Sequence, residues 1–105
     1  MAPRSLAAGS VEVRITPVKI DGSDAVFRVS LDTHMGELLV DLARQAHLDV
    51  GGTPWTGATW GGGPAGGHHR IGQLTFAAGG PAEGTAELTI DGLPAPVTAS
   101  WNLAG

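Results

Sequence analysis

Apolar and polar residues alternate one by one along most of this chain, and this period of two is typical of β-strands buried on one face. The clearest run is Phe27, Val29 and Leu31, with polar residues between them. The same alternation predicts further strands at 11–16, 69–76, 86–91 and 97–103. Pro17 interrupts the first of these and the apolar parity shifts by one after it, so a bulge or a change of sheet is expected there.

Glycine and proline separate the alternating segments. The 105 residues include 17 Gly and 7 Pro, and these gather in turn sequences such as DGSD at 21–24, GGP at 79–81 and DG at 91–92. Short strands with regularly spaced turns are typical of immunoglobulin-like sandwiches. We therefore expect an all-β, immunoglobulin-like or cupredoxin-like β-sandwich of six or seven antiparallel strands. Residues 11–105 form its single domain, and residues 1–10 are expected to be a flexible N-terminal arm.

Residues 37–48 are the one segment where a helix competes with a strand. Leu38, Leu39, Leu42 and Leu48 can be drawn on one helical face, and several neighbours are good helix formers. Apolar residues also occupy every second position here, at Leu38, Val40 and Leu42, and this alternation favours a strand. Because the neighbouring segments are strands, we favour a strand to about residue 44 followed by a turn.

The composition excludes several classes of function. Without cysteine there are no disulfides, thiolate metal sites, iron–sulfur clusters, blue-copper sites or cysteine nucleophiles. The six Lys and Arg residues are scattered and the net charge is −4, which argues against nucleic acids and anionic membranes as partners. The chain contains no run of 18 apolar residues, so no membrane span is predicted. The first ten residues are too short and too weakly apolar for a secretory signal.

The histidines are the sharpest candidate for chemistry. His34 follows a predicted strand, and His68 and His69 follow a glycine-rich segment. Imidazole is a common ligand of zinc and copper, and Met35 would be a soft ligand for Cu(I). Neighbours in a strand point to opposite faces, so we expect His34 to pair with only one of His68 and His69 unless the other lies in the loop. The alternative is that His68 and His69 only flank a loop and hydrogen-bond to backbone or to Asp32.

Residues 51–67 hold eight Gly, two Pro and two Trp, and a loop of this length is often functional. Trp55 and Trp60 have two interpretations. They could form an exposed aromatic platform that binds a sugar or a partner. They could instead fold inward and cap one end of the sandwich, which we favour for at least one of them. Trp101, on the last predicted strand, is expected in the core.

No catalytic motif is found. Ser30, Asp32 and His34 are types found in hydrolytic triads, but there is no G-x-S-x-G nucleophile turn and Ser30 lies on a strand. The glycine runs lack the Lys-Ser/Thr of a phosphate-binding loop. We therefore expect a protein that is not an enzyme.

Three sequence features together resemble a group of small prokaryotic domains found mostly in exported proteins or lipoproteins. They are F-x-V-x-L-D-T-H at 27–34, the Trp- and Gly-rich loop, and G-H-H-R-x-G-x-L-x-F at 67–76. The resemblance covers about half of the chain and implies the sandwich fold and an extracytoplasmic location, with no established activity attached. More loosely, a cysteine-free sandwich with scattered His and Met is similar to periplasmic copper-handling domains, but their clustered methionines are missing here, where only Met1 and Met35 exist.

The sequence therefore predicts a non-catalytic binding or interaction module. Its working face would include residues 51–67 and the histidines beside them, and its ligand would be copper or zinc held by His34, His68 and His69, or a protein partner. Two alternatives stay open. One is a structural or assembly domain whose histidines and tryptophans only anchor the loop, and the other is a carbohydrate binder that uses Trp55 and Trp60.

Overall fold

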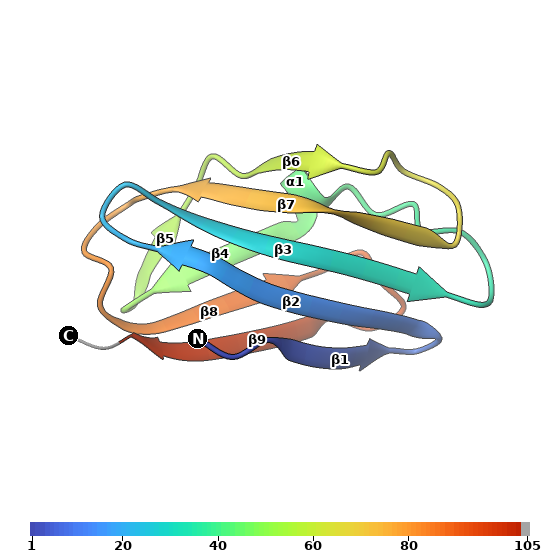
Figure 1. Ribbon diagram of the computed structural model, residues 1–105, viewed down its shortest axis with the longest axis horizontal. Helices are drawn as coiled ribbons and strands as arrows, with labels where there is room; N and C mark the ends of the chain where they lie inside the picture. The colour runs from blue at the N-terminus through green and yellow to red at the C-terminus, as the bar shows by residue number, and fades with distance from the viewer. Residues whose placement is uncertain (104–105) are drawn as a thin grey trace.

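The computed structural model describes residues 1–103, which form two antiparallel sheets packed face to face (Figure 1). The first sheet has the strand order β1-β2-β3-β7-β6, and the second has the order β5-β4-β8-β9. The elements are β1 (Arg4–Ala8), β2 (Val11–Ile20), β3 (Asp24–Thr33), α1 (Leu42–Gln45), β4 (Ala46–Val50), β5 (Thr53–Trp55), β6 (Thr59–Gly62), β7 (His69–Ala77), β8 (Gly84–Ile90) and β9 (Val97–Leu103). The predicted all-β sandwich is confirmed.

The strand order is that of an immunoglobulin-like domain. Strands β2-β3-β7-β6 and β4-β8-β9 correspond to the ABED and CFG sheets of that fold, with β1 added beside β2 and β5 added beside β4. Residues 1–103 thus contain nine strands rather than six or seven. The additional ones are short, and they lie in segments whose composition predicted an arm or a loop.

The core is built from the alternating residues of both sheets. Phe27, Val29 and Leu31 are fully buried, as predicted. Phe27 of β3 contacts Phe76 of β7 edge to face, with ring centroids 6.2 Å apart, and also Trp101 of β9 at 5.5 Å. Because Trp101 belongs to the second sheet, this aromatic group joins the two layers.

The first long hairpin follows its sequence signals closely. The register between β2 and β3 shifts between Pro17 and Lys19, which confirms the predicted irregularity. In the following turn, the Asp21 carboxylate accepts hydrogen bonds from the Ser23 hydroxyl at 2.7 Å, the Ser23 amide at 2.9 Å and the Asp24 amide at 3.2 Å. These bonds, with that from the Ser23 hydroxyl first, lower the pKa of Asp21 to about 2.

The strand predicted from 37 to about 44 is wrong, and the helical alternative holds for one turn only. Leu38 and Val40 are buried, which explains their alternation, but they lie outside any sheet. Asp41 caps α1 by accepting a hydrogen bond from the Arg44 amide at 3.3 Å, and β4 begins directly after this turn. The segment is too short for its apolar periodicity to distinguish a helix from a strand.

Residues 4–8 form β1, although they lie in the segment expected to be a flexible arm. β1 pairs with β2 from Arg4 opposite Ile15 to Ala8 opposite Val11. Just before β1, the Ala2 carbonyl accepts a hydrogen bond from the Trp101 indole of β9 at 2.6 Å, which connects this end of the chain to the other sheet. Backbone pairing and this long-range hydrogen bond hold the segment in place, although its few apolar residues did not predict a strand. Within residues 1–103, no helix is long and apolar enough to cross a membrane.

Candidate functional site

Two loops lie together at one end of the sandwich, on the right in Figure 1. They are residues 34–41, between β3 and α1, and residues 63–68, between β6 and β7. We call these two segments the loop end. Three of the four histidines of the chain, His34, His68 and His69, lie in or beside it.

Backbone hydrogen bonds connect the two loops directly. The Leu38 amide donates to the Gly67 carbonyl at 2.9 Å, and the Gly66 amide donates to the Leu38 carbonyl at 2.8 Å. At the base, the Thr33 amide donates to the His68 carbonyl at 2.9 Å. Gly66 and Gly67 both have positive φ angles, of 111° and 74°, which glycine adopts readily. The loop pair is therefore held in one arrangement.

Arg70 reinforces this arrangement from inside the protein. Its side chain is almost fully buried, and its guanidinium donates to the carbonyls of Val40 at 2.7 Å, Leu38 at 3.1 Å and Gly63 at 3.1 Å. It also faces the Trp60 ring, 5.7 Å from the centroid. Burial lowers the pKa of Arg70, and the negative charge of Asp41 partly offsets this. One side chain thus binds backbone from both loops.

The exposed surface of the loop end combines apolar and histidine side chains. Met35 and Leu39 are 74% and 66% exposed, the two highest values among the large exposed hydrophobic residues of the described chain. His34 and His68 are also exposed, and neither side chain makes a hydrogen bond within residues 1–103. Of the two histidines for which local hydrogen bonding was the alternative, His68 makes no such side-chain bond among the described residues.

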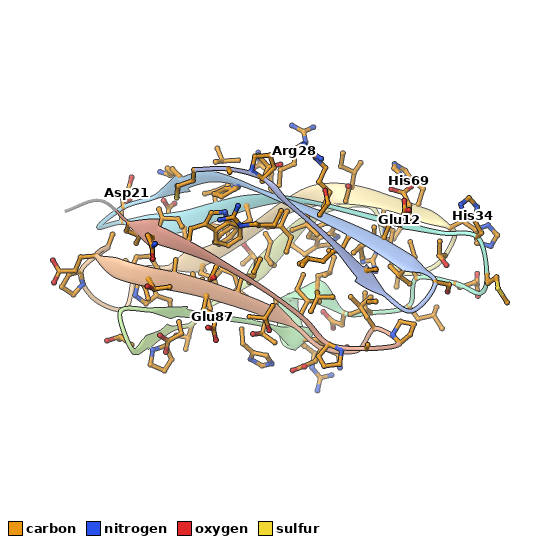
Figure 2. All side chains as sticks on the ribbon, turned by 90° about the horizontal axis from the view of Figure 1, so that it is seen from below. Glu12, Asp21, Arg28, His34, His69 and Glu87 are labelled. Carbon is orange, nitrogen blue, oxygen red and sulfur yellow. The ribbon has the colours of Figure 1, made fainter. Side chains whose placement is uncertain are left out.

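His69 lies on a different surface. It begins β7, faces outward, and its Nδ1 lies 2.5 Å from the Asp32 carboxylate, as the local-bonding alternative predicted. Glu12 is opposite Asp32 in the sheet, so the three residues form one row across β2, β3 and β7. Figure 2 shows Glu12 and His69 together on this face, with His34 further toward the end of the molecule.

The three predicted metal ligands are therefore not gathered into one site. Within residues 1–103, no group of three His, Asp or Glu side chains is placed to hold a metal ion. The reason is strand geometry: His68 lies in the loop and His69 is the first strand residue, so their side chains leave the backbone toward different surroundings. Metal binding by His34, His68 and His69 stays a prediction.

The two loop tryptophans occupy different environments. Trp55 ends β5 and is only 2% exposed, so the inward-folded interpretation is confirmed for it. Trp60 is half-buried on β6, and its indole donates to the Gly63 carbonyl at 2.9 Å. The sugar platform of Trp55 and Trp60 is wrong, because a buried indole cannot offer its face to a ligand. Residues 51–67, predicted as one loop, contain β5, a crossover at 56–58, β6 and the first part of the second loop of the loop end.

The structural role of Arg70 was missed by sequence reasoning. Its signal was present in the parity of β7, because Arg70, Leu74 and Phe76 occupy even positions and all three face the core. A charged residue at a core-facing position needs buried acceptors. The carbonyls that accept these hydrogen bonds belong to two loops elsewhere in the sequence, and no local sequence pattern identifies them.

A scan against protein-family models and searches of curated proteins and of solved structures find no match to this chain. The resemblance suggested by the sequence motifs therefore stays a prediction.

Proposed function

We propose that this domain is a non-catalytic binding module that contacts a protein partner through the loop end. The observation that carries the proposal is the display of Met35 and Leu39, both strongly exposed, on loops that hydrogen bonds and Arg70 already hold in place. A surface that is ordered before binding loses less conformational entropy when it binds. Loops at one end of an immunoglobulin-like sandwich are also a common place for recognition.

The unbonded histidines favour binding over a purely structural role. In a domain whose polar side chains only anchored the loops, His34 and His68 would be expected to contact them. Arg70 and Trp60 do this instead. His34 and His68 are left at the surface beside Met35 and Leu39, where they can hydrogen-bond to a partner.

Site-specific photocrosslinking tests this function. A benzophenone amino acid replaces Met35 in one variant and Val18 in another; Val18 is a comparably exposed apolar residue, at 56%, on β2 away from the loops. We expect a discrete adduct from position 35 alone, made in the cells that produce the protein. The adduct should disappear when Leu39→Ser is added. The purified partner should then bind the wild-type domain in calorimetry at least tenfold more tightly than the L39S variant.

Equal adducts from positions 35 and 18, or none from position 35, would contradict the proposal. The circular dichroism spectrum of Leu39→Ser should match that of the wild type, because the replaced side chain is two-thirds exposed. An extracytoplasmic location belongs to the same proposal, and fractionation of the producing cells tests it separately.

Copper binding is the second candidate function. The Thr33 amide donates a hydrogen bond to the His68 carbonyl, and His34 directly follows Thr33. The two exposed histidines therefore lie on backbone segments that are hydrogen-bonded to each other. Met35 is the next residue after His34. Calorimetric titration with Cu(II) and Zn(II) tests it, beside the variants His34→Ala and His68→Ala. Stoichiometric micromolar binding that both variants abolish would support a metal module. Binding that neither variant weakens would contradict it.

A further inference from the structure

The outer face of the first sheet carries a hollow of about 200 Å³ above β2, β3 and β7. The side chains that line it are Arg14, Thr16, Arg28, Ser30 and Ile71. Alternation brings them to this face, because the residues between them on β2 and β3 point into the core. All five are exposed or half-buried, so the lining is open to a ligand.

The strand register places the two arginines of the hollow at diagonal corners of a square. Arg14 of β2 is opposite Ser30 of β3, and Thr16 of β2 is opposite Arg28 of β3. Diagonal neighbours on one face of a sheet are about 7–8 Å apart, which long side chains can span. Both guanidinium groups can therefore reach one group that is bound above the two hydroxyls.

Most of the donors around the hollow have no acceptor in the protein. The Arg14 Nη1 donates to the Ser5 hydroxyl at 3.3 Å, and this is the one side-chain hydrogen bond of the hollow among the described residues. No carboxylate of the described chain lies within 4 Å of the guanidinium of Arg14 or Arg28. Two like charges thus lie close together, and an anion between them would relieve their repulsion.

The carboxylates of this face lie one row nearer the loop end. Glu12 is opposite Asp32, and Asp32 is engaged by the Nδ1 of His69. Figure 2 shows Glu12 and His69 close together on this face and Arg28 apart from them. The hollow itself is therefore lined by positive and neutral side chains.

We infer that this hollow binds the phosphate monoester of an aromatic compound, with the phosphate between Arg14 and Arg28 and the ring against Ile71. The planar guanidinium group matches phosphate oxygens in pairs. A phosphate monoester carries nearly two negative charges at pH 7, which two arginines balance. Ile71 is 43% exposed and supplies an apolar surface beside them. Because the site is open to solvent, we expect a weak Kd, on the order of 1 mM for phenyl phosphate.

Backbone amide signals in a nitrogen-15 NMR spectrum test the inference. At pH 7.5 and constant ionic strength, phenyl phosphate should shift the Thr16 and Ser30 signals until they saturate. The signal of Glu87, which is exposed on the opposite sheet (Figure 2), should stay nearly unchanged. Phenyl sulfate has a similar shape but one negative charge, so it should bind about threefold more weakly.

Variants separate the charges from the apolar contact. Arg14→Gln and Arg28→Gln should each raise the Kd about three- to fivefold. Arg44→Gln is the matched control, because it makes the same change in net charge at an exposed position on α1, outside the hollow. Ile71→Thr keeps a β-branched side chain and should weaken phenyl phosphate while it leaves inorganic phosphate unchanged.

A shift that does not saturate would overturn the inference. So would an Arg44→Gln effect as large as those of Arg14→Gln and Arg28→Gln, because long-range attraction would then explain the binding. Equal binding of phenyl phosphate and phenyl sulfate would overturn the choice of phosphate, and equal binding of phenyl phosphate and inorganic phosphate would overturn the role of Ile71. The hollow contains no residue of the loop end, so Leu39→Ser should leave the titration unchanged whatever the outcome of the photocrosslinking.

Discussion

Arg70 carries its charge into the interior without an ion pair within 4 Å among the described residues. Three backbone carbonyls and one aromatic face surround the guanidinium instead. Hydrogen bonds from a charged donor are stronger than neutral ones, and removal of the donor leaves buried carbonyls without a partner. The residue therefore stabilises the loop end and also determines its shape.

Replacement of Arg70 tests this role. Arg70→Met keeps the length of the side chain but removes all three donated bonds, so we expect the free energy of unfolding to fall by about 3 kcal/mol. Arg70→Lys keeps the charge without the planar fork and should lose less. Urea denaturation measures both. Amide exchange should also accelerate at Leu38 and Gly66, whose amides connect the loops.

Arg28→Met provides the control for these measurements. Arg28 is exposed on the outer face, and exposed substitutions of this kind usually change stability by less than about 0.5 kcal/mol. If Arg70→Met were as mild as Arg28→Met, the carbonyl contacts would not hold the loops as described.

The pairing of β6 with β7 depends on two glycines that lie opposite each other. Gly62 pairs with Gly72, and a Cβ atom on Gly72 would lie 2.6 Å from the Gly61 carbonyl oxygen and from the Gly62 Cα. The Trp60 ring would be 2.9 Å away. The absence of these side chains lets Trp60 lie close to the sheet, where its ring faces Arg70.

We expect Gly72→Ala to destabilise the protein by about 1–3 kcal/mol, since backbone atoms must move to admit the methyl group. The loss should concentrate in β6, with faster amide exchange at Gly63, whose amide donates to the Ile71 carbonyl. Gly22→Ala is the matched control, because a Cβ at Gly22 would meet no atom within 4 Å. Equal effects of the two substitutions would show that the strands do not depend on this contact.

Strands with strict alternation were predictable, and shorter elements were not. β2, β3, β8 and β9 each bury every second residue for most of their length, so a local pattern was sufficient. β5 and β6 have three and four residues, too few for a period to emerge. The candidate site was predicted in part: His34 and His68 lie at the loop end, but the support from Arg70 depends on carbonyls about 30 residues away in sequence.

The whole molecule has one core, and noncovalent contacts alone join its sheets, since cysteine is absent. Phe27 lies at the centre of this core, in contact with aromatic rings of both layers. We expect Phe27→Leu to lower the free energy of unfolding by about 1–2 kcal/mol, and Phe27→Ala to cost about 3–5 kcal/mol.

Denaturation followed by tryptophan fluorescence and by far-ultraviolet circular dichroism measures these effects. The two signals should show the same midpoint in each variant, because both sheets share the core and should unfold together. Separate midpoints would contradict a single cooperative domain. Val18→Ala is the control, as Val18 is exposed and lies outside the core.

The position of Arg70 also has a consequence for how such a domain can diversify. Its acceptors at residues 38, 40 and 63 fix the stems of the two loops, while residues 34–36 and 64–65 at their tips give it no bond. Substitutions at the tips can therefore accumulate in related lineages without loss of the support beneath them. Insertions between a tip and its stem would displace a carbonyl and leave a buried charge uncompensated. Natural variants of this fold should accordingly differ in the chemistry of the tips far more than in the lengths of the two loops.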